Sequence, residues 1–264
     1  ASPERLVDIG PLEADRNHRL RIAPDRRAET QSIFVARGRD LRRVATSTRA
    51  GIGLFYTYIT KQVCNFKHLQ EGKTMGLAAW GSPDGAHRFP VFPDHVFQGV
   101  DTLMMDWLTE HAAAFRMRAD EPATDPAFAD AAWWAQSVLE RAMLHLADTA
   151  LKTTGCRHLC MAGGVPLNIE ANRAIRDRAP GEVFVQPAAS DAGMPLGAAL
   201  YGYYNILRGE HRFQTNKVYL GPAPDESAAE ALLVSRGGHV SDDVPTEGAR
   251  HLAKGRIIGW WQGR

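Results

Sequence analysis

The chain has 264 residues, of which 44% are hydrophobic and 23% charged, a composition that excludes disorder, collagen-like repeats or coiled coil as the dominant state. The 31 Lys and Arg residues balance 30 Asp and Glu residues, and the net charge of +1 gives no general attraction to nucleic acid or to an anionic membrane. Three cysteines form no disulfide framework in a chain of this length, so we expect a cytoplasmic protein. From the balanced charge and the lack of an apolar run long enough to span a bilayer, we expect no membrane or nucleic-acid partner.

The N-terminal part of the sequence begins with an irregular, arginine-rich stretch that we interpret as a solvated loop. Two apolar segments, Gln31–Val35 and Leu41–Ala45, then flank a turn at Gly38. This pattern predicts a β-hairpin.

A helix is expected next, over the apolar and aromatic segment Ile52–Val63. Its helical spacing predicts a packed face formed by Leu54, Tyr58 and Ile59. The Ser-Pro-Asp-Gly sequence at residues 82–85 predicts a turn, because these residue types favour chain reversal.

The central part of the sequence alternates helices with short apolar strands. The longest helix is expected to begin at Asp125-Pro126, a capping residue followed by Pro in the first turn, and to end at Gly155. Beyond it we expect strands at 158–162 and 182–186 and helices at 166–178 and 191–207. This order predicts an α/β fold with a mainly parallel, buried sheet, whose functional loops follow the carboxyl ends of the strands.

A second unit is expected to begin after a linker between Arg208 and Pro224. The segments expected in it are helices at 227–233 and 246–253 and a strand at 257–261. Fewer than sixty residues cannot easily form an independent core, and the chain lacks an initiator Met. We therefore expect a piece of a longer protein.

Two glycine-containing segments stand between a strand and a helix. In Ala162–Asn168, two adjacent glycines at the start of a helix could admit a phosphate, although the segment matches neither a P-loop nor a dinucleotide fingerprint and a tight turn explains it equally well. In Ala189–Gly197, Asp191 could hold a metal ion, but taken alone a helix cap is favoured. Loops after successive parallel strands face one crevice, which favours a shared ligand.

A third glycine-containing segment, Gln70–Gly76, carries two opposite charges. Glu71 could bind ribose hydroxyls and Lys73 could bind a phosphate. The alternative is a surface salt bridge in a turn, which we favour on this segment alone.

Other conspicuous residues are interpreted as structural. Cys156 and Cys160 fit a packed core better than a zinc site, because no four-ligand set lies nearby. The Trp pairs at 133–134 and 260–261 are interpreted as core aromatics. No Gly-x-Ser-x-Gly sequence occurs, which disfavours a serine hydrolase.

Taken in order, the motifs resemble the ATP-dependent O-carbamoyltransferases of nodulation-factor and antibiotic biosynthesis. The motifs that carry this resemblance are Glu29–Ser32, Gly53–Thr60, Glu71–Gly81, Ala162–Asn168 and Ser190–Gly193, and Gly259–Arg264 is similar to the start of the family's Gly-Arg-Met-Glu-Phe-Gly-Pro-Arg motif. They cover nearly the whole chain, and several collinear motifs are more specific than one glycine pattern.

The resemblance implies two domains. Residues 1–210 would be a truncated actin/hexokinase-like α/β domain, and residues 211–264 the start of a YrdC-like α+β domain. ATP and carbamoyl phosphate would form carbamoyl adenylate in the YrdC-like domain. The first domain would then transfer the carbamoyl group to a hydroxyl of a small-molecule acceptor, such as an antibiotic or another secondary metabolite, with a divalent metal that we expect to be Fe(II). A homodimer is compatible with this expectation.

The resemblance also implies roles for particular residues. Those implied to form the nucleotide site are Gly163, Gly164, Val165, Asn168, Ser190 and Gly193, with Glu71 and Lys73 on the ribose and phosphate side. Asp8 and Asp191 are implied to be metal ligands, and Arg264 would begin the motif on the carbamoyl phosphate side. No residue is assigned as the general base.

The sequence departs from the family in three respects. The His-x-x-x-His metal motif expected just before Ala1 and most of the YrdC-like domain are absent, and Pro166 stands where alanine is more usual. Two alternatives stay open. A tRNA threonylcarbamoyl transferase would need a basic surface to bind tRNA, and the near-neutral net charge of the chain disfavours this alternative. A non-catalytic nucleotide-binding module would bind ATP and form no carbamoyl product.

Overall fold

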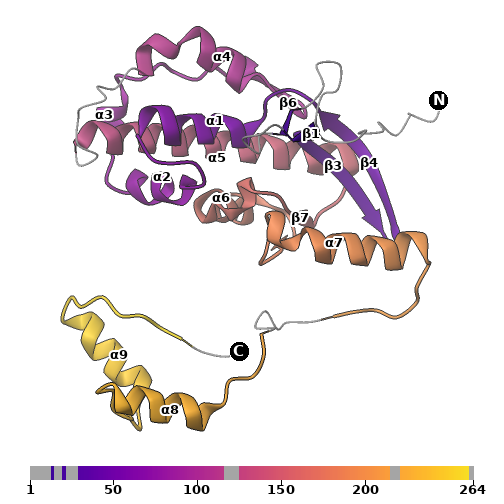
Figure 1. The fold of residues 1–264 in the computed structure, drawn as a ribbon. Coiled ribbons are helices and arrows are strands. Elements are labelled where there is room, and N and C mark those ends of the chain that lie inside the picture. Colours follow the sequence, from indigo (N-terminus) through magenta and orange to yellow (C-terminus); the bar gives the residue numbers. More distant parts are fainter. Residues whose placement is uncertain (1–12, 15–19, 22–28, 116–124, 215–220, 262–264) are drawn as a thin grey trace. The chain divides into compact units, whose positions relative to one another are not determined.

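The computed structural model describes residues 13–14, 20–21, 29–115, 125–214 and 221–261. The chain divides into two compact units, residues 1–210 and 211–264. The strands described in the first unit are β1 (Glu13–Ala14), β2 (Leu20–Arg21), β3 (Gln31–Arg37), β4 (Asp40–Ser47), β5 (Phe97–Gln98), β6 (Asp101–Thr102), β7 (Leu159–Met161) and β8 (Val183–Val185). Its α-helices are α1 (Ile52–Tyr58), which continues as the π-helical segment Ile59–Val63, α2 (Glu71–Ala78), α3 (Pro83–Ala86), α4 (Met104–Glu110), α5 (Pro126–Thr154), α6 (Ile169–Arg178) and α7 (Met194–Tyr201). The second unit contains α8 (Glu226–Ser235) and α9 (Val244–Ala253) (Figure 1).

The 29-residue helix α5 organises the first unit. It begins where the carboxylate of Asp125 accepts a hydrogen bond of 2.8 Å from the backbone N–H of Ala127, with Pro126 in the first turn. It ends at Gly155, which has a left-handed φ of 67° and donates its N–H to the Leu151 carbonyl. Both ends confirm the sequence prediction. Helices α1, α2, α3 and α6 pack against α5 (Figure 1).

Aromatic side chains fill the core beside α5. The ring of Phe92 lies 4.4 Å from that of Trp107 and 5.8 Å from that of Phe55, measured between ring centres. Trp134 is 7% exposed and belongs to the same core, while Trp133 packs against it from a partly buried position. The predicted core role of this Trp pair is therefore confirmed.

The packed face of α1 differs in part from the prediction. Ile59 is fully buried, but Leu54 is 54% exposed, and Phe55 and Tyr56 face the core instead. Apolar residues occur on several sides of this short segment, so their spacing alone fits more than one helix face.

The two turn predictions in the N-terminal part have different outcomes. β3 and β4 pair antiparallel, and Gly38 in the turn between them has a φ of 63°, so the predicted hairpin is confirmed. The Ser-Pro-Asp-Gly sequence forms one turn of helix, α3, because the Ser82 hydroxyl accepts a hydrogen bond from the Gly85 N–H at its start.

The parallel sheet is smaller than predicted. β7 and β8 pair in parallel as expected, but they form a two-stranded sheet, and the other pairs among the described strands are antiparallel. Leu159 and Met161 pack against the core, whereas Cys160 between them is exposed. The prediction that Cys156 and Cys160 are packed in the core is wrong: Cys156 is only partly buried, and alternation along the strand directs Cys160 to the opposite face.

The second unit has two capped helices and no buried residue among those described. Asp225 accepts from the Ala228 N–H at the start of α8, and Asp243 accepts from the Thr246 N–H at the start of α9, which confirms both predicted helices.

The predicted strand at 257–261 is wrong, since this segment has no regular structure. The core role predicted for the Trp pair at 260–261 is also wrong, because Trp261 is 84% exposed. A strand needs a partner for its backbone groups, and none is found among the described residues 211–214 and 221–261.

Candidate functional site

The two glycine-containing loops meet at the carboxyl ends of β7 and β8. The parallel register pairs Met161 with Val185, so both strands deliver their following loops to the same edge of the sheet. The backbone N–H of Gly163 donates a hydrogen bond of 2.6 Å to the carbonyl of Ala189. This direct link confirms the predicted meeting of the loops, which is the usual location of a ligand in a parallel sheet.

The two glycines of the first loop have different structural reasons. Gly163 has a φ of 113°, a conformation that L-amino acids with a Cβ rarely adopt. Gly164 has an ordinary φ of −68°, is exposed, and has open space where a Cβ would lie. Of these two positions, the fold therefore requires glycine only at 163, and the space beside Gly164 is free for a ligand.

Helix α1 lies directly against this loop. A Cβ on Gly53 would be 3.3 Å from the side chain of Val165, so the absence of a side chain allows the close approach. Val165 begins a 3₁₀ turn, Val165–Leu167, whose N–H groups precede the first turn of α6. Pro166 is buried in this turn, where its missing N–H costs little.

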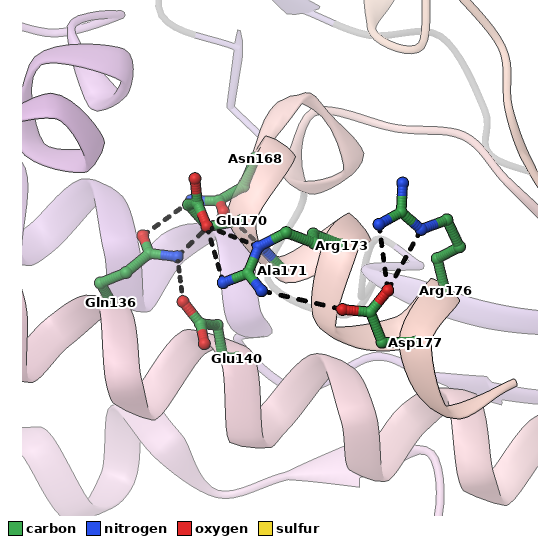
Figure 2. Close-up of polar contacts among 8 residues, drawn as sticks. All are labelled: Gln136, Glu140, Asn168, Glu170, Ala171, Arg173, Arg176 and Asp177. Atoms are coloured by element: carbon green, nitrogen blue, oxygen red, sulfur yellow. Dashed lines mark hydrogen bonds and ion pairs between the residues drawn. The ribbon is translucent and has the colours of Figure 1, made fainter.

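Asn168 connects the loop to α5 by a buried amide pair. Its Oδ1 accepts hydrogen bonds from the Ala171 N–H and from Nε2 of Gln136, both at 3.0 Å, and its Nδ2 donates to Oε1 of Gln136 at 2.9 Å (Figure 2). Nε2 of Gln136 also donates to Glu140, and the Tyr56 hydroxyl donates to Oε1 of Gln136, each at 2.9 Å.

The hydroxyl of Tyr56 in this network keeps its proton. Burial, reinforced by the negative charges of Cys64 in its thiolate form and Glu140, raises the pKa of Tyr56 above the usual range of a phenol.

The second loop presents an exposed carboxylate. Asp191 lies within a 3₁₀ turn, Asp191–Gly193, and caps neither this turn nor α7. The helix-cap alternative is therefore wrong. In the described part of the chain its carboxylate has no hydrogen bond or ion pair. Ser190 precedes the turn without a side-chain cap bond, and a Cβ on Gly193 would collide with the Ala188 carbonyl.

Glu71 and Lys73 lie in the first turn of helix α2, not in a loop or turn. The Glu71 carboxylate accepts a hydrogen bond of 2.7 Å from the Thr57 hydroxyl of α1. The exposed Lys73 ammonium lies 5.8 Å from the ring centre of Phe66. No ion pair between Glu71 and Lys73 is found in the described structure, so the surface salt-bridge alternative is not supported.

The remaining predicted residues lie outside the described part of the chain. Asp8 and Arg264 are among them, and the roles proposed for all site residues stay predictions. Within the described residues, no group of three or more His, Cys, Asp or Glu side chains is arranged to hold a metal ion. None of the described helices has the length and apolar character that a membrane crossing requires.

Sequence reasoning missed Gln136 and its link to the loop. The signal was present as a polar residue in the apolar stripe of α5, between Trp134 and Val138. A polar side chain on a buried helix face needs a hydrogen-bond partner, but spacing alone did not identify Asn168 as that partner.

Comparison with known proteins gives matches over most of the chain. Residues 10–200 match the family model described as carbamoyltransferase N-terminus. The chain is 33% identical over 243 residues to "Nodulation protein NolNO" of Sinorhizobium fredii, covering 88% of this chain and 35% of that protein. It is 35% identical over 225 residues to "Nodulation protein NolO" of Bradyrhizobium diazoefficiens, covering 81% of this chain and 40% of that protein. The chain thus spans between a third and two fifths of the length of these relatives, and it belongs to the carbamoyltransferase family.

Proposed function

We propose that this chain is the N-terminal part of an O-carbamoyltransferase that uses carbamoyl adenylate, formed from ATP and carbamoyl phosphate. The family match over residues 10–200 supports carbamoyl transfer. The observation that carries the adenylate assignment is the direct hydrogen bond from Gly163 to Ala189, which joins two glycine-containing loops at one sheet edge. We further propose a small-molecule hydroxyl as the acceptor.

The proposed binding geometry uses the backbone of the first loop. The open space at Gly164 lets a phosphate approach the chain closely, and N–H groups at the start of a helical turn favour an anion. Glu71, on α2, would accept hydrogen bonds from ribose hydroxyls, and Lys73 would contribute positive charge on the phosphate side. Gly163, Val165, Asn168, Ser190 and Gly193 would shape the two loops.

The proposed transfer is a substitution at the carbamoyl carbon. The acceptor oxygen forms a bond to this carbon, the bond from the carbon to the phosphate oxygen breaks, and AMP leaves with the bonding electron pair. The acceptor hydroxyl gives its proton to a base. N–H groups around the phosphate stabilise the charge that develops on AMP, which makes AMP the better leaving group.

Metal binding is a separate part of the proposal. Of the two predicted ligands, the structure describes only Asp191, which is exposed, and the described residues contain no cluster of three ligands. This set alone does not fit an Fe(II) site, so the mechanism contains no step through a metal. Asp8 and Asp191 stay predicted ligands of a divalent cation.

The test is a transfer assay with full-length protein. The protein is incubated with ATP, carbamoyl phosphate labelled at the carbonyl carbon, and a panel of small alcohols, with tRNA as a separate acceptor. The proposal expects label in a small alcohol and release of AMP. AMP release with label in tRNA would contradict the acceptor class, and ATP binding without any AMP release would favour a non-catalytic module.

A further inference from the structure

A buried glutamine on α5 is the strongest feature that the proposed function does not use. Gln136 is 7% exposed and Asn168 is 7% exposed. They lie 32 positions apart in the sequence and join two different helices. The pair therefore links the central helix of the unit to the start of α6, directly after the glycine loop.

The hydrogen-bond pattern fixes the orientation of both amides. The Ala171 N–H can only donate, so the Asn168 atom facing it at 3.0 Å must be the carbonyl oxygen. The Asn168 amino group then faces Gln136, whose oxygen accepts from it and from Tyr56. The Gln136 amino group uses its two protons on Asn168 and Glu140. Each partner thus has one allowed orientation.

This pair reaches the loop backbone through Asn168. The Asn168 N–H donates to the Val165 carbonyl at 2.9 Å, and the Leu167 N–H donates to the Gly164 carbonyl at 3.2 Å. The turn that carries Gly164 is therefore anchored at its far end by a residue whose side chain is held by Gln136. Figure 2 shows the amide pair beside the start of α6.

We propose that Gln136 is a positioning residue, which holds the loop Gly163–Leu167 in the geometry that binds the phosphate of the adenylate; this rests on the proposed function. Stability alone gives a weak reason for two buried amides, because apolar side chains of similar size could fill the same space without loss. A hydrogen-bonded amide pair is directional, so it holds the side chains and the attached backbone in one orientation. A phosphate site built from backbone N–H groups depends on the orientation of those groups.

The first experiment compares two variants that each disrupt a buried hydrogen-bonded pair. Gln136→Leu removes the amide pair, and Thr60→Val removes the 2.8 Å bond between the fully buried hydroxyls of Thr74 on α2 and Thr60 in the π-helical segment after α1. AMP, the stable part of carbamoyl adenylate, is titrated by calorimetry into full-length protein, well below each variant's melting temperature. We expect Gln136→Leu to weaken AMP binding at least tenfold and Thr60→Val less than twofold.

A second variant serves if Gln136→Leu does not fold. Gln136→Glu supplies a donor to Asn168 only when protonated. Its neighbours from the packed elements are Tyr56 of α1, Glu140 of α5 and, beyond Glu140, Arg173 of α6. The nearby Glu140 disfavours a second negative charge. We expect the AMP affinity of Gln136→Glu, relative to unmodified protein at each pH, to rise as the pH is lowered from 8 to 6.

The outcomes separate the positioning role from the proposed function. If unmodified protein does not bind AMP, the proposed adenylate site is wrong. If unmodified protein binds AMP and Gln136→Leu binds it within twofold, or if Gln136→Leu and Thr60→Val lose affinity equally, Gln136 has only a structural role. A pH-independent relative affinity of Gln136→Glu would overturn the inference as well.

Discussion

At the scale of single residues, the two adjacent glycines of the first loop serve different purposes. Gly163 is required by its φ of 113°, whereas Gly164 has an ordinary φ and free space around it. The sequence identified both residues but could not distinguish them, because backbone dihedral angles are set by the whole loop. Substitution with alanine separates the two reasons.

We predict that Gly164→Ala leaves the free energy of unfolding nearly unchanged and weakens AMP binding, because the new methyl group occupies the space proposed for the phosphate. Gly163→Ala should cost about 1–3 kcal/mol of stability, since alanine must adopt a disfavoured backbone conformation. Urea unfolding and AMP calorimetry on both variants check this. Unchanged AMP affinity in Gly164→Ala would contradict the proposal that the phosphate binds beside Gly164.

The cysteines should differ in reactivity. Cys64 is fully buried, and burial raises the pKa of its thiol to about 12, while Cys160 is exposed. Because only the thiolate is reactive, iodoacetamide at pH 8 should modify Cys160 within minutes and leave Cys64 intact, as read by peptide mass spectrometry.

The same pKa shift has a consequence for stability. Folding favours the neutral thiol of Cys64. The contribution of this buried thiol to the free energy of unfolding is therefore fully present below the pKa of about 8.5 that a free thiol has. This contribution is lost as the pH rises toward 12.

Equal labelling of Cys64 and Cys160 by iodoacetamide in the folded protein would contradict the burial of Cys64.

At the scale of elements, α5 and its ends were predictable because their signals are local. The capping carboxylate of Asp125, Pro126 and the left-handed Gly155 act within one turn of the helix, and the apolar stripe fixes the face between them. The mistakes concern elements whose state depends on distant partners. Cys160 is exposed because one face of the β7–β8 sheet carries no cover in the described structure, and the segment 257–261 has no strand to pair with.

The cap of α5 gives a direct test at this scale. We predict that Asp125→Ala lowers the free energy of unfolding by about 1 kcal/mol, because the Ala127 N–H loses its acceptor. The matched control is Asp125→Asn, which should cost only a few tenths of a kcal/mol, since Asn caps about as well as Asp. Equal losses for the two variants in urea unfolding would argue against the capping bond.

At the scale of the whole molecule, the chain forms two units, 1–210 and 211–264. The candidate site draws its described residues from α1, α2, α5 and the two loops after β7 and β8, all in the first unit. The sequence motifs predicted which loops matter, and the parallel pairing explains why they meet. The buried pair of Gln136 and Asn168 could not be predicted, because it joins helices by tertiary packing alone.

We predict that limited proteolysis cuts between residues 208 and 224 before it cuts between residues 127 and 207. The second unit has no buried residue among those described, whereas in the first unit α6 contacts both α5 and β8. Mass spectrometry of the first fragments identifies the cut. Early cleavage within 127–207 would contradict the division into two units.

The central claim is that the paired glycine loops hold the adenylate. The most direct measurement is a crystal structure of the protein with AMP bound. We predict the phosphate within hydrogen-bond distance of the backbone N–H groups at Gly164 or Val165, with the ribose directed toward Glu71. A well-ordered AMP bound elsewhere, with the space beside Gly164 empty, would contradict the account.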